Sequence, residues 1–147
     1  MVDKLKQESD FPKNLDVDPE LLNLCVKFYH DQFWVVINGD SIPVQEIADK
    51  IYDTAVNMSP LVSIKIFQNT LNILNKNQKL YRDIEDDGKI GQDTLGALGS
   101  YLATDSVDLL LKVMNVSQGC RYLQLLLEPD QEDFARGWFS RVEINKI

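Results

Sequence analysis

The stretch "DIEDDGKIGQDTLGAL", from Asp83 to Leu98, joins acidic residues, spaced glycines and the start of an apolar helical pattern. Its first half has the spacing of a calcium-binding loop, with ligands at positions one, three and five and a glycine at six: Asp83, Glu85, Asp87 and Gly88. Position twelve is Thr94, where such a loop needs a bidentate glutamate, and residues 76–81 lack the apolar stripe of an entering helix. A calcium-responsive protein is therefore a weak alternative.

The same stretch is better explained as a turn that opens a helix. Asp87-Gly88 is a turn dipeptide in which glycine tolerates positive φ. Ile90 is expected to enter the core, and Gly91 to allow a close backbone approach. Thr94 then begins the apolar side of the next helix. We predict that Asp87, Gly88, Gly91 and Thr94 form a structural turn without metal.

Helix signals dominate on both sides of this turn, because apolar residues recur at helical spacing after capping residues and prolines. Six helices are predicted, at about 19–39, 44–58, 60–74, 92–101, 105–127 and 130–142. Only residues 34–37 have any strand character. The fold class is all-α, and the length suits a single compact unit over 1–147. Gly119, inside the fifth helix, suggests close helix packing.

Composition narrows the class of protein. The formal net charge of −8 argues against nucleic-acid binding and against docking on anionic membranes. The first residues form no apolar signal-peptide core, and no apolar run is long enough to span a membrane. Cys25 and Cys120 lie in apolar stretches, so we expect two reduced core thiols rather than a disulfide. His30 has no nucleophile partner in the sequence and is expected at the surface.

Five stretches in order carry a family resemblance. Asp-Gly-x-x-Gly-x-x-Thr, from Asp87, resembles the repeat signature of small helical peptidoglycan-binding domains. The other four are "FYHDQFW" (28–34), "YDTAVNMS" (52–59), "IKIFQNTLNIL" (64–74) and "FARGWFSRV" (134–142). Together they resemble glycoside hydrolase family 108, the N-acetylmuramidase-like proteins once labelled secretion activators, which end in a peptidoglycan-binding-like part. Ser59 stands where the family pattern has glycine.

The resemblance implies a lysozyme-like helical fold with residues 1–58 in the muramidase lobe and 59–147 in the peptidoglycan-binding-like part. The implied activity is hydrolysis of the β-1,4 bond between N-acetylmuramic acid and N-acetylglucosamine in peptidoglycan, with no cofactor or metal. It also implies synthesis in the cytoplasm and action in the periplasm or cell wall, after export by a holin or a secretion machine.

The family's catalytic glutamate lies in a Glu-Gly-Gly-Tyr motif, which this sequence lacks. Glycoside hydrolysis needs a general acid of raised pKa, and Glu8 and Asp10 lie in a polar stretch that offers no such environment. We therefore assign no catalytic residue and expect the chain alone to hydrolyse poorly. The alternative is a non-catalytic module that binds peptidoglycan or a protein. An absent N-terminal segment would leave apolar surface exposed, so some self-association is expected.

Five residues are candidates for contact with the glycan strand. Asp53 and Asn57 share one helix face, and the resemblance places this Asp-x-x-x-Asn pair near the family's cleft. Their alternative role is to satisfy helix ends and nearby backbone. Tyr29 and Trp34 are expected either to stack on sugar rings or to pack. Gln68 lies amid apolar residues, so it is either buried and hydrogen-bonded or directed into a cleft.

Overall fold

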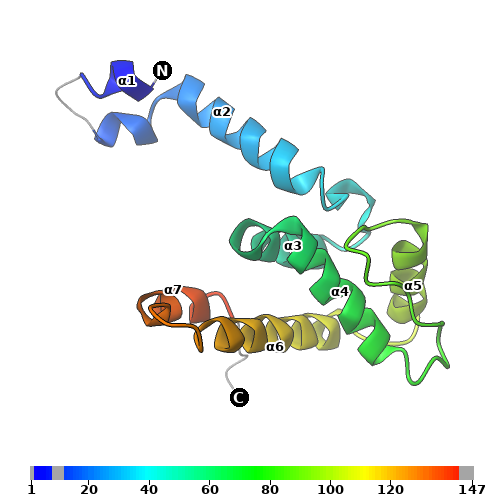
Figure 1. Ribbon diagram of the computed structural model, residues 1–147. Helices are drawn as coiled ribbons and strands as arrows, with labels where there is room; N and C mark the ends of the chain where they lie inside the picture. The colour runs from blue at the N-terminus through cyan, green and yellow to red at the C-terminus, as the bar shows by residue number, and fades with distance from the viewer. Residues whose placement is uncertain (1, 8–11, 143–147) are drawn as a thin grey trace.

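The computed structural model describes residues 2–7 and 12–142, and these are helical with no strand among them (Figure 1). The predicted all-α class is confirmed. The α-helices are α1 (Val2–Leu5), α2 (Pro19–Tyr29), α3 (Gln45–Met58), α4 (Pro60–Leu74), α5 (Gln92–Leu102), α6 (Val107–Leu125) and α7 (Ala135–Phe139). Shorter helical turns are η1 (Lys13–Asp16), η2 (His30–Trp34), η3 (Gly39–Ser41) and η4 (Glu132–Phe134).

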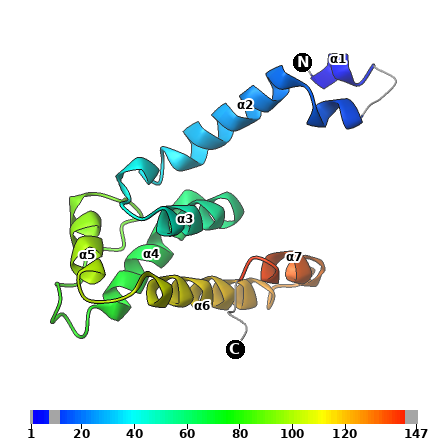
Figure 2. The same ribbon diagram turned by 180° about the vertical axis from the view of Figure 1, so that it is seen from behind.

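The core lies where α3, α4 and α6 pack together and α5 closes one end (Figure 2). Its fully buried side chains come from the apolar stripes of these helices: Ile47, Ile51, Ile64, Phe67, Leu71, Leu98, Leu110 and Met114. Burying a large apolar side chain stabilises the fold by about 1.5–3 kcal/mol. Ile90 joins this core from the loop before α5, as predicted.

Local caps set where the helices begin. The carboxylate of Asp18 accepts a hydrogen bond from the backbone N–H of Leu21 at 2.7 Å, which starts α2. Ser106 caps α6 by accepting a hydrogen bond from the N–H of Leu109, so the helix begins two residues later than the predicted residue 105. The last helix is shorter than predicted, because α7 covers only Ala135–Phe139 after a 3-10 turn.

Helix α2 stands away from the core in both views and buries none of its residues (Figures 1 and 2). The prediction of one helix from Pro19 to about Gly39 is wrong, because a π-helical turn follows at His30–Trp34. The weak strand expectation at residues 34–37 is also wrong, since these residues form the end of that turn and a hydrogen-bonded turn beyond it. After this π-helical turn, the Trp34 ring packs against Tyr52 on α3.

Two expectations about small residues are corrected. Cys25 and Cys120 are free thiols as expected, but both are exposed and neither belongs to the core. Gly119 is buried, yet an added Cβ would meet its nearest neighbour, Val142 Cγ1, at an ordinary 3.6 Å. Close packing therefore does not require glycine there. In the described part of the chain, no helix has the length and apolar character needed to cross a membrane.

Candidate functional site

The side chain of Gln68 organises the loop that precedes α5. Gln68 lies on α4 and is only 1% exposed. Its Nε2 donates to the Asp87 carboxylate at 2.9 Å, the Lys89 carbonyl at 3.0 Å and the Thr94 hydroxyl at 3.1 Å. Its Oε1 accepts from the Gly88 N–H at 2.9 Å. Of the two alternatives predicted for Gln68, the structure places it buried and hydrogen-bonded within the chain.

The turn around Gln68 has the geometry predicted for Asp87-Gly88. Gly88 has φ of +76°, which favours glycine, whereas Gly91 has φ of −106° and no atom near an added Cβ. The predicted close approach at Gly91 is therefore wrong. The Gln68 amide, with help from the Lys89 backbone, holds the pKa of Asp87 below its ordinary value.

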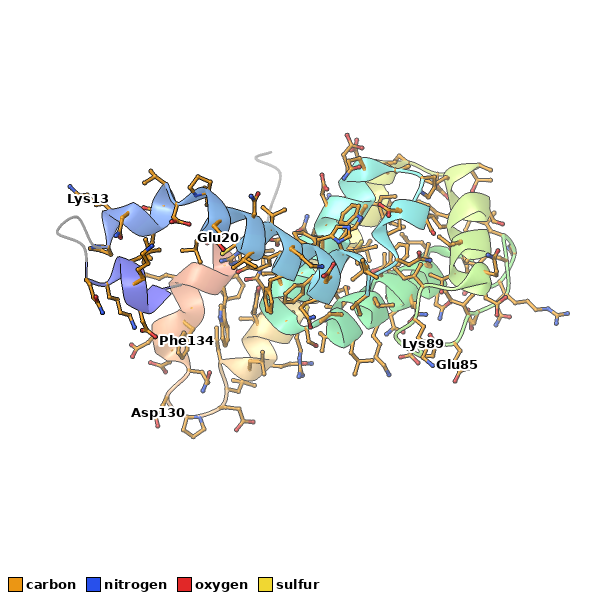
Figure 3. The ribbon with its side chains drawn as sticks, turned by 90° about the horizontal axis from the view of Figure 1, so that it is seen from above. Lys13, Glu20, Glu85, Lys89, Asp130 and Phe134 are labelled. Atoms are coloured by element: carbon orange, nitrogen blue, oxygen red, sulfur yellow. The ribbon has the colours of Figure 1, made fainter. Side chains whose placement is uncertain are left out.

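The outer side of this turn borders a shallow pocket of about 280 Å³ that Glu85, Lys89 and Asp93 help to line. Figure 3 shows Glu85 and Lys89 at the end of the molecule opposite Lys13. Within residues 2–7 and 12–142, no group of three or more His, Cys, Asp or Glu side chains is placed to hold a metal ion. The hydrogen bonds of Gln68 join α4 to the loop that precedes α5.

Asp53 and Asn57 lie one turn apart on the partly exposed edge of α3. The Asn57 amide donates to the Asp53 carbonyl at 2.7 Å and to its carboxylate at 3.3 Å. The same carboxylate lies 3.6 Å from the Arg141 guanidinium, beyond the end of α7. Asn57 therefore satisfies neighbouring backbone, as its alternative role required, while Asp53 meets a cation from the far end of the chain.

Two pockets lie along α3, and Asp53 and Arg141 both line the second of them. One, of about 280 Å³, is lined from α3 by Asn57 and from α6 and α7 by Arg121, Tyr122 and Trp138. The other, of about 360 Å³, has α3 carboxylates on one wall, with Leu111, Asn115 and Arg141 on the other. We call these two pockets the α3 cleft. Carboxylates, amides and guanidinium groups together supply both donors and acceptors to a polar ligand.

Trp138 is held firmly in the wall of the α3 cleft. Its ring stacks on Tyr122 at 5.2 Å between centroids and on Phe134 at 5.6 Å. With a ring on each face, Trp138 can offer a ligand only its edge. Behind this wall, Lys50 donates to the Gln118 amide at 2.6 Å and Gln118 donates to the Tyr122 hydroxyl at 3.2 Å. The Lys50–Gln118 bond joins α3 to α6, and the Gln118–Tyr122 bond lies within α6.

An apolar groove of about 390 Å³ lies on the other side of α3, between that helix and α2. We call it the aromatic groove; it is lined by Leu22, Cys25, Val26, Tyr29, His30, Trp34 and Tyr52. The Trp34 indole N–H donates to the Asp40 carboxylate at 2.8 Å, and its ring meets Tyr52 edge-on. Tyr29 stacks on Phe33 and contacts the Phe28 ring in a T-shaped arrangement, and it remains 43% exposed. Of the five predicted contact residues, Tyr29 and Trp34 thus share one groove, Asp53 and Asn57 border the α3 cleft, and Gln68 lies apart.

Sequence reasoning missed Arg121 and Arg141 as parts of a site. The Arg141 side chain is half-exposed and lies 3.6 Å from the Asp53 carboxylate. The two residues are 88 positions apart, and nothing in the local pattern of either links them. His30, by contrast, is exposed as predicted and lies 3.1 Å from the neighbouring Asp31 carboxylate.

The family described as "Predicted Peptidoglycan domain" matches residues 62–143, more than half of the chain. The chain belongs to this family. No curated protein matches it. The matched range runs from α4 through α7 and includes Arg121, Trp138 and Arg141, which form one wall of the α3 cleft. Membership supports a cell-wall binding role with peptidoglycan as the partner.

Proposed function

We propose that this chain binds the glycan strand of peptidoglycan along α3, with Asp53 and Asn57 as hydrogen-bonding contacts. One observation carries the proposal: the Asp53–Arg141 pair joins the sequence-predicted residues to the wall formed by the family-matched part. Sugar hydroxyls and N-acetyl groups need both donors and acceptors, and the α3 cleft offers both. Support also comes from the size of its pockets, about 280 and 360 Å³.

The aromatic groove extends this surface in our proposal. Tyr29 and Trp34 contact apolar faces of neighbouring sugar rings, while Asp53 and Asn57 bind their polar groups. Tyr52 and Asp53 are consecutive on α3, and they line the aromatic groove and the α3 cleft respectively. A glycan lying across α3 therefore reaches both. Gln68, buried and fully bonded, supports the fold of the matched domain instead of touching sugar.

Binding is separable from cleavage. In our proposal the chain is of the glycoside hydrolase family 108 type and has a lysozyme-like helical arrangement. Residues 1–58 belong to its muramidase lobe. It acts in the periplasm or cell wall after holin-dependent or secretion-system-dependent export. We assign no catalytic general acid to this chain, so binding without hydrolysis is the function we propose.

Purified cell-wall sacculi test binding and hydrolysis together. Incubation followed by sedimentation measures the bound fraction, and chromatography of the supernatant measures released muropeptides. We expect the chain in the pellet and no soluble muropeptides above the level of a buffer control. Release of muropeptides would overturn the non-catalytic assignment, and a chain that stays in the supernatant would overturn the binding proposal.

Site variants test where the glycan binds. Asp53→Asn keeps the shape of the side chain but removes its charge and its pairing with Arg141. We expect weaker co-sedimentation, by about tenfold in affinity, because a charge-assisted hydrogen bond contributes roughly 1.5–3 kcal/mol. Asp108→Asn, at an exposed position in the first turn of α6, is the matched control. Equal binding by both variants would place the glycan elsewhere.

A second activity is self-association, for which the exposed apolar residues of α2 are the specific observation. We propose that copies of this chain associate through that helix. Sedimentation velocity over a concentration series tests it, and a constant monomer mass would contradict it.

A further inference from the structure

Helix α2 presents a second apolar face that the aromatic groove does not use. Leu22, Cys25, Val26 and Tyr29 line the groove. A different face carries Leu21, Leu24 and Phe28, spaced by three and four residues, and Val17 lies just before the start of the helix. We call these four residues the outer face of α2. Val17 is 71%, Leu24 52% and Phe28 56% exposed, and the Phe28 ring also contacts the rings of Tyr29 and Phe33.

One acidic and one basic side chain lie beside the outer face of α2, so that two copies of the face can pair opposite charges. Glu20 lies in the first turn of α2 and Lys27 in the last, seven residues apart and on the same side of the outer face. If a second α2 runs antiparallel, its Lys27 comes opposite Glu20, and its Glu20 comes opposite Lys27. Parallel helices in register would instead place the Glu20 and Lys27 side of each helix at opposite edges of the contact, where these charges do not meet. A closed two-fold interface needs a patch that is complementary to itself, and the outer face of α2 meets this condition.

We propose that the outer face of α2 binds the same face of a second copy of this chain, with the two helices antiparallel. This deepens the self-association proposed above and rests on it. Leu24 packs against its counterpart near the two-fold axis, and Leu21 packs against Phe28 of the second copy. Two ion pairs, each between Glu20 and Lys27 of different copies, border the contact. Antiparallel alignment also brings the positive end of each helix dipole beside the negative end of the other.

The surroundings of Lys27 fit this arrangement. Its ammonium already contacts the Asp31 carboxylate one turn later, and its side chain is 73% exposed. Hydrogen bonds from Lys27 and then His30 hold the pKa of Asp31 below its ordinary value. In the dimer Lys27 lies between Asp31 of its own chain and Glu20 of the second copy. Figure 3 shows Glu20 on α2, well away from the end of the molecule that carries Glu85 and Lys89.

The dimer leaves the proposed glycan surfaces open. The aromatic groove uses the other face of α2, and the α3 cleft lies beyond α3. Two linked sites on one insoluble polymer bind more tightly than either alone, because the second contact forms at high effective concentration. A contact between two helices of 11 residues is small, so the dimer is weak and depends on protein concentration.

Charge reversal of the full chain tests the register. Sedimentation equilibrium over a concentration series measures the average mass, which we expect to rise from 16.8 kDa toward twice that value. Glu20→Lys and Lys27→Glu each replace two opposite-charge pairs with two like-charge pairs. Each should raise the dimer dissociation constant about tenfold, and the double variant should restore it. Asp108→Lys with Lys112→Glu, a reversal on exposed positions of α6, is the matched control.

A second pair of variants tests the apolar contact. Leu24→Asp places two carboxylates near the axis and should abolish dimerisation, while Leu123→Asp, at a comparably exposed leucine of α6, should not. Because α2 buries no residue, the melting temperature of the core is insensitive to this helix, so the helix content by circular dichroism shows whether the Leu24 variant keeps α2. A wild-type mass that stays at 16.8 kDa, or dimers that survive both Leu24→Asp and the single reversals, would overturn the proposal.

Binding to sacculi separates this inference from the proposed function. The monomeric Leu24→Asp variant should keep its affinity for soluble glycan fragments and lose only the extra retention on sacculi. If fragments do not bind either protein while the dimer forms, the glycan proposal fails and the dimer stands.

Discussion

Ser59 is the most informative position for a stability test, because a serine occupies a backbone conformation that suits glycine. It lies at φ 92° and ψ 150°, between α3 and α4. This region is essentially reserved for glycine, because a Cβ crowds the backbone there, and strain of this kind costs roughly 1–3 kcal/mol. The family pattern that the sequence resembles has glycine at this point. We therefore predict that Ser59→Gly stabilises the protein.

The expected magnitude follows from three effects. Removing the Cβ releases the strain of roughly 1–3 kcal/mol. Glycine makes the unfolded chain more flexible, which opposes this by about 0.4–1 kcal/mol. Loss of the serine hydroxyl, which accepts from the Val62 N–H at a long 3.5 Å, costs a few tenths of a kcal/mol. The net change in the free energy of unfolding is a gain of about 1 kcal/mol, or roughly 2–4 °C in melting temperature.

Urea unfolding followed by circular dichroism measures this change, and Ser59→Ala is the control. Alanine keeps the Cβ, and therefore the strain, while losing the cap, so it should be slightly less stable than the wild type. If Ser59→Gly unfolds at lower urea concentration than the wild type, the hydroxyl cap outweighs the strain and the reasoning is wrong.

Three further predictions concern hydrogen-bonded polar side chains, each measured by urea unfolding. Gln68→Leu removes the four hydrogen bonds that Gln68 makes to the turn and should lower the free energy of unfolding by about 3 kcal/mol, whereas Asn69→Leu, at the exposed neighbouring position, should change it far less. Hydrogen bonds from Gln68 lower the folded pKa of Asp87 from 3.8, so its contribution is present above pH 3.8 and is lost on further acidification. The stability difference between wild type and Asp87→Asn should therefore shrink below that pH; a constant difference would contradict it. Burial raises the pKa of Tyr81 from 10.0 to about 12, so the stability it contributes is lost as pH rises between these values, and Tyr81→Phe should weaken that alkaline loss.

Local signals in the sequence predicted much of the fold. Ser59-Pro60 marks the start of α4 because a cap and a proline act within one turn of the chain. The Asp87-Gly88 turn was predicted for the same reason, since its positive φ at Gly88 is a property of two residues. The beginning of α3 and the bounds of α5 also follow from apolar spacing alone.

Features that depend on distant contacts could not be predicted this way. The partners of the Gln68 side chain lie in a loop about 20 residues later. The sequence alone was therefore compatible with a buried Gln68 and with one directed into a cleft. Arg141 lies beside Asp53 because α7 packs against α6, a contact that the local sequence does not indicate. Cys25 lies in an apolar pattern, which predicts burial, yet α2 has no partner within the described chain to bury it.

Binding of glycan along α3 is the central claim, and the two tryptophans of the chain report on it directly. Trp34 lines the aromatic groove and Trp138 the α3 cleft, and each gives one indole N–H signal in a nitrogen-15 spectrum. We predict that soluble disaccharide-repeat fragments of peptidoglycan shift both indole signals along a single saturation curve. If both signals stay in place throughout the titration, the proposed binding surface is wrong.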